Sequence, residues 1–421
     1  MTETTKTDRT APLIGGDWTD PLEDGVRSRV RDFIETILEE ELEAALGRGR
    51  YERKSAGAKG YRNGHRDREI VGTFGPETVR VPRARIAGAD GRSREWRSQA
   101  LPRYRRLTRK AEALIAGAYL AGTNTRRVKR ALSTLFAGAV GKDVVSRAWR
   151  KVKTDWEAWA ARDLGGEDIV RLILDGTVVK ARIDKKATAI PILVAIGVRR
   201  DGQKVLIGLK NMGGETTAAW RAFLQDLSAR GLREPDFLVV DGAPGLEAAL
   251  AELWPDAPVQ RCTVHKHRNL LAHAPKRLHD ELTEDYRDMI YAETATEIER
   301  RRKAFLRKWQ LKCRAVADSL EEAGARLFTF TRLPPGQWKS ARTTNAPFRR
   351  FAMQIAYRAM IERLHAEFKR RIKTQTVLPQ ADTAPMLFWA LLASGQIVMR
   401  KVDGWETLDQ PLTDQPIDLA A

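Results

Sequence analysis

Three long segments rich in β-branched and other apolar residues follow one another in the middle of the chain. They limit the possible fold more than any other feature. The segments span residues 169–183, 189–198 and 204–211, and turn-forming residues separate them. Such segments are typical of buried strands, and strands joined by short turns pair antiparallel. We therefore expect a three-stranded antiparallel meander.

Helices and strands alternate in the next part of the chain. An amphipathic helix is expected over residues 216–230, ended by Gly231, and another over residues 246–253. Short apolar strands are expected at 237–240 and 259–264. Antiparallel strands followed by alternating helix and strand predict an α/β fold whose mixed sheet is covered on both faces.

The regions on either side of this core are predicted to be richer in helices. An acidic amphipathic helix is expected over residues 28–46, then a polar loop that contains residues 61–66, and a short hairpin around Gly75-Pro76. Helices over 107–120, 123–136 and 143–160 suggest either a helix-turn-helix unit or an ordinary helical bundle with a charged exterior. Residues 269–330 are predicted to be helical, 332–342 a loop, 348–372 a basic helix and 385–398 a terminal helix.

These patterns divide the chain into six parts. We expect an acidic helical segment (1–50), a helix-rich basic region (51–160), the first part of a core (168–268), an all-α insertion (269–340), the C-terminal helices of the core (341–405) and a tail (406–421).

Positive charge is concentrated in one part of the chain. Residues 51–150 hold 24 Lys and Arg against 8 Asp and Glu, so they carry +16 of the formal net charge of +19. A cluster of this kind favours nucleic acid as a partner. A solvated basic surface, or attraction to anionic lipid, remains the alternative.

The sequence lacks the features of membrane-spanning, secreted and ATP-using proteins. No run of about 18 apolar residues occurs, so no membrane span is expected. Residues 1–10 lack the apolar region of a signal peptide, and two cysteines cannot make a disulfide framework, so we expect a cytoplasmic protein. The absence of a Walker loop argues against ATP use.

Two acidic residues occur where predicted strands meet glycine. Asp175 follows Leu-Ile-Leu and precedes Gly176, and Asp241 follows Leu-Val-Val and precedes Gly242. Either one alone is most simply a turn or helix cap. Together, on neighbouring strands, they suit a site for hard divalent cations, Mg²⁺ or Mn²⁺, of the kind that supports phosphoryl transfer.

Cys262-x-x-His265 provides half of a zinc site. No second Cys pair completes the coordination, and Cys313 is the only other cysteine. The simpler interpretation is a buried thiol with a polar His near the site. Either residue then acts by orienting a carboxylate or a phosphate rather than by binding metal.

Several segments taken in order resemble the Mutator-type transposases of bacterial insertion sequences, which are DDE transposases with a ribonuclease-H-like catalytic domain. The resemblance extends from about Glu39 to Trp405. The matching segments are Gly60-Tyr61-Arg62-Asn63-Gly64-His65-Arg66, Val81-Pro82-Arg83-Ala84-Arg85, Leu174-Asp175-Gly176, Val240-Asp241-Gly242-Ala243-Pro244-Gly245-Leu246, Gln260-Arg261-Cys262-Thr263-Val264-His265, Arg268-Asn269 and Arg342-Thr343-Thr344-Asn345.

The resemblance implies which acids act. Asp175 and Asp241 are the first two catalytic and metal-binding acids, and Glu362, in Ile361-Glu362-Arg363-Leu364, is the third. The family places this stretch almost directly after Thr-Thr-Asn, whereas here residues 347–360 intervene. Glu367 is the competing candidate, about 140° further around the helix.

The resemblance also implies a function. We expect the chain to bind terminal inverted repeats and target DNA, and to cleave and join DNA strands as a homodimer or larger assembly in the bacterial nucleoid. The expected DNA-binding residues are Arg62, Asn63, His65, Arg66, Arg83, Arg85, Arg126, Arg127, Arg147, Arg150 and Arg268. The alternatives are a DNA-binding copy inactivated by residues 347–360, and a nuclease of the same core fold without strand transfer.

Overall fold

The computed structural model divides the chain into two compact units. One comprises Met1–Tyr119 and Asn124–Trp149, and the other Leu120–Thr123 and Arg150–Ala421. The residues that the structure describes are 21–52, 59–88, 92–104, 106–120, 132, 136, 142–183, 186–344, 368–369, 378, 380–395 and 397–413. None of the described helices is long and apolar enough to cross a membrane.

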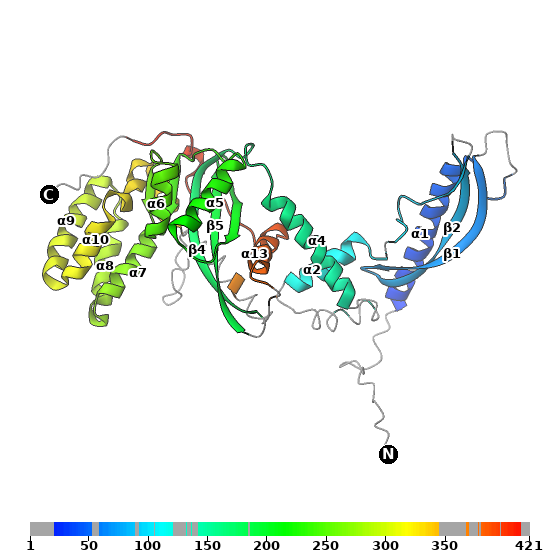
Figure 1. Cartoon of the computed structure of the whole chain (residues 1–421), viewed down its shortest axis with the longest axis horizontal. Helices are drawn as coiled ribbons and strands as arrows, with labels where there is room; N and C mark the ends of the chain where they lie inside the picture. The colour runs from blue at the N-terminus through cyan, green and yellow to red at the C-terminus, as the bar shows by residue number, and fades with distance from the viewer. Residues whose placement is uncertain are drawn as a thin grey trace, which may run out of the picture. The chain divides into compact units, whose positions relative to one another are not determined.

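The N-terminal unit consists largely of a long helix packed on one face of a small sheet (Figure 1). Helix α1 (Pro21–Leu46) is followed by strands β1 (Gly60–Gly72), β2 (Gly75–Ala87) and β3 (Ser93–Glu95), which pair antiparallel in that order. Leu38 packs with Ile70, Val79 and Val81, and Leu42 and Leu46 pack with Ala84. The expected helix and hairpin are confirmed.

The hairpin is longer than expected, which corrects one prediction. Tyr61 to Arg66 lie on strand β1 and not in a loop. These residues are too polar for an ordinary strand facing a core, but the helix that covers them is acidic. Arg62 and His65 both bond to Glu39 on α1, so a polar segment is held in a strand by polar partners.

Two of the three expected helices of the basic region lie among the described residues. They are α2 (Arg109–Leu120) and α4 (Lys142–Ala160), and α4 crosses the boundary between the two units. The helix expected over 123–136 lies outside the described residues apart from Leu132 and Phe136, so the helix-turn-helix remains a prediction.

A five-stranded mixed sheet forms the centre of the second unit. Strands β4 (Ile169–Ile183), β5 (Lys186–Arg199) and β6 (Lys204–Asn211) pair antiparallel, which confirms the meander. Strands β7 (Phe237–Val240) and β8 (Val259–Arg261) run parallel to β4, giving the order β6-β5-β4-β7-β8. Strand β8 ends earlier than expected, because a helix begins at Thr263.

Helices cover both faces of this sheet, as expected. Helices α5 (Thr217–Ala229) and α6 (Pro244–Leu253) pack on one face through a cluster that includes Trp220 and Phe223. On the other face Arg171 of β4 is buried and donates hydrogen bonds to Gln337 (2.9 Å) and Ser340 (3.2 Å) of α11 (Pro335–Ala341).

The described segment from Thr263 to Ala341 is helical throughout its regular elements. It contains α7 (Thr263–His273), α8 (His279–Ile290), α9 (Ala295–Lys312), α10 (Arg314–Ala323), α11 and the short turns Lys276–Leu278, Ala325–Leu327 and Thr329–Arg332. The prediction of a loop over residues 332–342 is therefore wrong for Pro335–Ala341, which form α11. Proline suits the first turn of a helix, and Pro335 begins this one.

The C-terminal part is described only in places. Helix α13 (Thr383–Ala393) replaces the expected helix 385–398 and ends near Gly395, whose φ of 71° is left-handed. A last short turn spans Trp405–Thr407. The helix expected at 348–372 lies outside the described residues, except for Phe368 and Lys369.

Side chains occupy both edges of the sheet. On the β6 edge, Arg162 donates hydrogen bonds to the carbonyl oxygens of Leu206 (2.8 Å) and Ile207 (3.4 Å). On the β8 edge, the Thr329 hydroxyl donates to the Val259 carbonyl oxygen (2.7 Å), and the backbone N–H of Phe330 donates to the Gln260 side chain (2.7 Å).

Candidate active site

Three titratable residues lie side by side, each directly after one of the residues paired across three adjacent strands. Leu174 of β4 pairs with Val240 of β7, and Val240 pairs with Arg261 of β8. The next residue of each segment is Asp175, Asp241 and Cys262, respectively. The backbone N–H of Cys262 donates to the Val240 carbonyl oxygen (2.7 Å), so the hydrogen bonding between β7 and β8 extends to Cys262. Neighbouring strands lie about 4.8 Å apart, which makes Asp175 and Asp241 direct neighbours.

Asp175 is a buried acid in an unfavourable environment for its charge. Its exposed fraction is 3%, and it lies within β4 opposite Val194 of β5. Burial raises the pKa of its carboxyl group well above the usual value, and the charges of Asp241, Cys262 and Glu215 raise it further, whereas His265 lowers it. A bound cation would favour the ionised form.

Asp241 lies beside Asp175 and also forms a hydrogen bond within the turn that follows β7. One carboxylate oxygen accepts a hydrogen bond from the backbone N–H of Ala243 (2.9 Å), and Gly242 takes a left-handed φ of 91°. The turn interpretation that the sequence left open is therefore correct for this bond. It is compatible with a second role, because a carboxylate has further acceptor positions.

Cys262 and His265 form a coupled pair at the start of α7. The thiol is fully buried, and the Thr343 and Thr344 hydroxyl groups each lie 3.3 Å from its sulfur. Although burial opposes it, the pKa of Cys262 is lowered to about 6 by His265 and these hydroxyls. The pKa of His265 is raised to about 9 by Cys262, Asp175 and Asp241, again against burial. Both shifts favour the charged forms of the pair, a thiolate and an imidazolium.

The prediction of a buried thiol is confirmed. Within the described part of the chain, no three side chains of His, Cys, Asp or Glu are grouped to hold a metal ion. Cys313 lies elsewhere, with its sulfur 3.6 Å from the His273 carbonyl oxygen.

Residues 342–344 reach this site from a distant part of the sequence. The carbonyl oxygen of Arg342 accepts a hydrogen bond from the backbone N–H of Thr263 (3.0 Å), which places Thr343 and Thr344 against Cys262. Asn345, Glu362, Glu367 and residues 347–360 lie outside the described residues.

Sequence reasoning missed Glu215, which precedes α5. A side chain on Gly176 would collide with it, because a Cβ atom there would lie 2.2 Å from a Glu215 carboxylate oxygen. The pKa of Glu215 is raised by burial and by Asp241. An acid between the glycines 213–214 and the helix cap Thr216, directly after a predicted strand, was the available signal.

The expected DNA-binding residues fall into three groups. Arg62 and His65 are paired with Glu39, and Arg62 also with Glu43, inside the N-terminal unit. Exposed positions are held by Asn63, Arg66, Arg83, Arg85, Arg147 and Arg150, and by Arg268 on α7 in the other unit. Arg126 and Arg127 lie outside the described residues.

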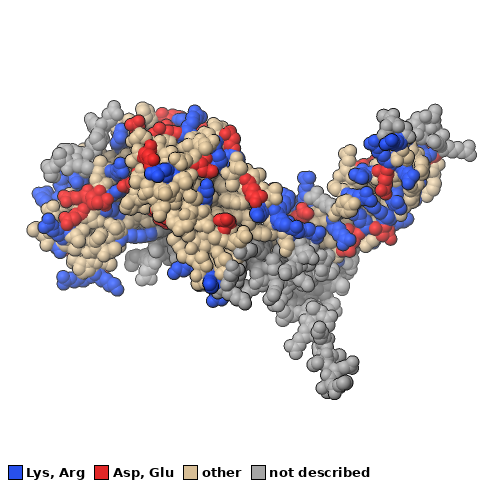
Figure 2. Space-filling view, in the orientation of Figure 1, with Lys and Arg blue, Asp and Glu red and all other residues tan. Residues whose placement is uncertain are grey.

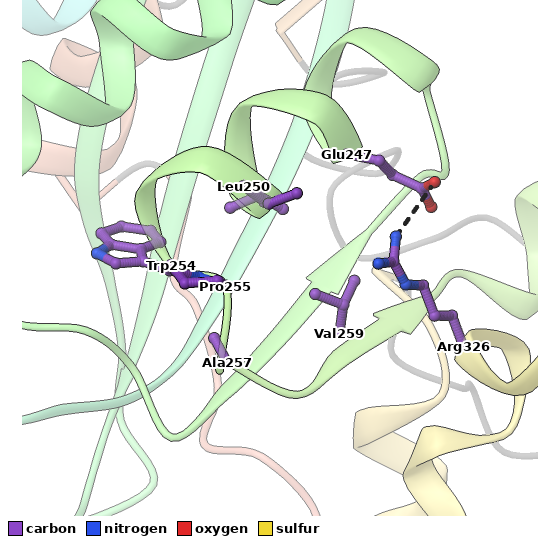
Figure 3. Close-up of a pocket in the computed structure, with 8 residues that line it drawn as sticks. Glu247, Leu250, Trp254, Pro255, Ala257, Val259 and Arg326 are labelled. Atoms are coloured by element: carbon purple, nitrogen blue, oxygen red, sulfur yellow. Dashed lines mark ion pairs between the residues drawn. The ribbon is translucent and has the colours of Figure 1, made fainter.

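A small cavity beside α6 is not part of this site. Trp254 and Val259 line it, and an ion pair between Glu247 and Arg326 (3.5 Å) lies at its rim (Figure 3). Its volume is about 120 Å³, and neither Asp175 nor Asp241 is among the described residues that line it.

Comparison with known proteins gives a consistent result. Residues 1–397 match the family model described as "Transposase, Mutator family". The chain is 30% identical over 368 residues to the "Transposase for insertion sequence element ISRM5" of Rhizobium meliloti, covering 87% of each chain. It is 28% identical over 373 residues to the IS406 transposase of Burkholderia multivorans (88% of this chain, 90% of the relative) and 28% identical over 370 residues to the IS1081 transposase of Mycobacterium tuberculosis (88% and 84%). The chain therefore belongs to the Mutator family of transposases.

Proposed function

We propose that this chain is a DDE transposase that cleaves DNA at the ends of an insertion sequence and joins the freed ends to target DNA. The adjacent positions of Asp175 and Asp241 on parallel strands carry the proposal. The strand order, with three antiparallel strands and two parallel ones, supports a ribonuclease-H-like core with residues 269–340 as its helical insertion.

The donor chemistry of the site fits a divalent cation. Two carboxylates held side by side supply the hard oxygen ligands that Mg²⁺ and Mn²⁺ prefer, and Glu362 is the proposed third ligand. When bound, such ions activate an attacking hydroxyl and stabilise the leaving oxygen of a phosphodiester. Asp175 and Asp241 would hold and orient these ions, and the burial of Asp175 keeps bulk water away from its carboxylate.

His265 supplies positive charge to the same site. Its imidazolium is kept protonated by the Cys262 thiolate, so it is available to interact with a phosphate oxygen near the two acids. Cys262 acts through His265 and is a positioning residue. Thr343 and Thr344 hold the thiolate through their hydroxyl groups.

Cleavage of labelled element-end duplex by the full chain with Mg²⁺ tests the proposal. Asp175→Asn and Asp241→Asn are expected to abolish nicking and strand joining and to leave DNA binding intact. Asp236→Asn is the matched control, because Asp236 is exposed at the opposite end of β7 from Asp241. Cleavage by either site variant at the parent rate would remove that acid from the site.

The third acid and the intervening segment need separate variants. Glu362→Gln is expected to abolish cleavage and Glu367→Gln to preserve it. If the parent binds DNA but does not cut it, deletion of residues 347–360 is expected to restore cleavage. A deletion variant that also fails to cut would favour a chain that acts only by binding DNA.

A further inference from the structure

The β1–β2 hairpin has one covered face and one open face. On the covered face, Val79, Val81 and Ala84 pack against α1. Side chains alternate along a strand, so Arg80, between Val79 and Val81, and Arg83 and Arg85, on either side of Ala84, point away from α1. Arg80, Arg83 and Arg85 are accordingly exposed.

Two of the basic residues that the sequence suggested as DNA-binding residues lie on the covered face and are paired there with Glu39. Glu39 accepts hydrogen bonds from Arg62 and from His65, the latter at 2.6 Å, and burial leaves these side chains only about one-fifth exposed. The charges on this face are therefore matched within the unit. The exposed arginines of the hairpin lie on the other face.

The open face changes character along its length. Toward the turn, Asp67 lies directly opposite Arg80. Toward the strand ends, Tyr61 lies directly opposite Arg85, and Asn63 and Arg83 are exposed beside them. Figure 2 shows Lys and Arg side chains spread over this unit.

A bulge sets the position of Asn63. The pairing shifts between Arg62 and His65, and Gly64 has a left-handed φ of 73°. Such a bulge bends a strand and redirects a side chain. One acid lies close to both arginines: Glu95 of β3 lies directly opposite Arg85 in the sheet and 3.6 Å from Arg83, and the Arg83 and Glu95 side chains are more than 40% exposed. An exposed pair of this kind is weak and exchanges readily for another partner.

These residue types match the pattern of base edges. The major groove is about 12 Å wide and admits a two-stranded ribbon, whereas the minor groove is about 6 Å wide. Arginine bonds to guanine O6 and N7 there, and asparagine bonds to adenine N6 and N7. We propose that the open face of the hairpin enters the DNA major groove and that Asn63, Arg83 and Arg85 contact base edges, with Tyr61 packed beside them. This inference rests on the proposed DNA-binding function and names the element that reads sequence.

The test uses the full chain without divalent cation, so that no cleavage occurs. Duplexes that the parent binds are selected from a random pool, and affinities are measured for Arg83→Ala, Arg85→Ala and Asn63→Ala. Arg80→Ala is the matched control, on the same strand and face but nearer the turn, away from the proposed base-contacting end of the hairpin. The first three variants are expected to lose at least about fivefold in affinity for the selected duplex, and the control less than twofold.

A modified probe identifies the groove. Replacing guanine by 7-deazaguanine removes the N7 acceptor in the major groove and leaves every phosphate in place. The parent is expected to lose affinity for that probe, whereas Arg83→Ala or Arg85→Ala, having already lost the contact, loses no more. Equal losses for parent and variants, or variants that bind as the parent does, would overturn the major-groove contact while leaving DNA binding intact. A parent that binds no duplex would instead overturn the DNA-binding function itself. Unchanged melting temperatures confirm that the exposed substitutions leave the fold intact.

Discussion

Replacing Asp175 by Asn should stabilise the protein in the absence of divalent cations, although it removes a proposed catalytic residue. Asp175 and Asp241 directly follow paired residues of the adjacent parallel strands β4 and β7, whose backbones lie about 4.8 Å apart. At an effective dielectric constant of about 20, two like charges at that distance repel by about 3 kcal/mol. The largest gain is that Asn removes the cost of burying a charge, whereas loss of the attraction between Asp175 and His265, which exceeds the repulsion from Asp241, opposes it.

We therefore expect a net stabilisation of about 1–2 kcal/mol, which raises Tm by about 2–8 °C. The assay is thermal unfolding in EDTA at pH 7.5, followed by tryptophan fluorescence. Added Mg²⁺ should stabilise the parent in proportion to its occupancy and stabilise the variant much less. Asp168→Asn is the control, because Asp168 is exposed one residue before β4 and pairs with Arg200.

The effect should depend on pH in a defined direction. Because the pKa of Asp175 is raised in the folded protein, the unfolded chain releases the proton first as pH rises. The penalty is therefore present above the folded pKa and disappears as pH falls toward 3.8. The difference in Tm between Asp175→Asn and the parent should therefore decrease as pH falls toward 3.8. A variant that is less stable than the parent in EDTA, and that responds equally to Mg²⁺, would refute the reasoning.

Three further outcomes are expected. Glu39→Gln should lower the stability of the N-terminal unit by about 1–2 kcal/mol, because it weakens the bonds to Arg62 and His65, and chemical denaturation measures this. His265→Gln should return the pKa of Cys262 from about 6 to 9 or above, so thiolate absorbance near 240 nm at pH 7.5 should vanish in a Cys313→Ser background. The lowered pKa of Cys262 stabilises the folded protein fully above the pKa of the unfolded thiol, and this stabilisation is lost as pH falls through about 6. The difference in unfolding free energy between the parent and His265→Gln should therefore decrease as pH falls toward 6. Binding of the full chain to duplex DNA should weaken by about 10³-fold between 50 and 200 mM salt if six phosphates are contacted, and salt-insensitive binding would contradict a phosphate-based interface.

The sheet was predictable because its strands are buried on both faces. Strands β4, β6 and β7 have the expected bounds, since a continuous run of apolar, β-branched residues identifies such a strand without reference to its neighbours. The placement of Asp175 and Asp241 directly after paired residues of neighbouring strands agrees with the same order of elements.

The missed features depend on distant partners. The polar start of β1 resembles a loop until Glu39 of α1 is placed against it. Helix α7 begins at Thr263 beside residue 342, some eighty positions later, so the local pattern suggested a longer strand β8. Glu215 lies against Gly176, which leaves space for its carboxylate, and only the folded chain brings the two together.

The occupied edges of the central sheet limit how copies of this chain can assemble. An open edge strand offers free N–H and C=O groups to which another chain can add a strand. Here Arg162 donates hydrogen bonds to two carbonyl oxygens of β6, and the Thr329 hydroxyl donates one to a carbonyl oxygen of β8. Copies of this chain are thus directed away from strand addition at these positions and toward contacts between side chains, which can form and separate without opening the sheet that holds Asp175 and Asp241.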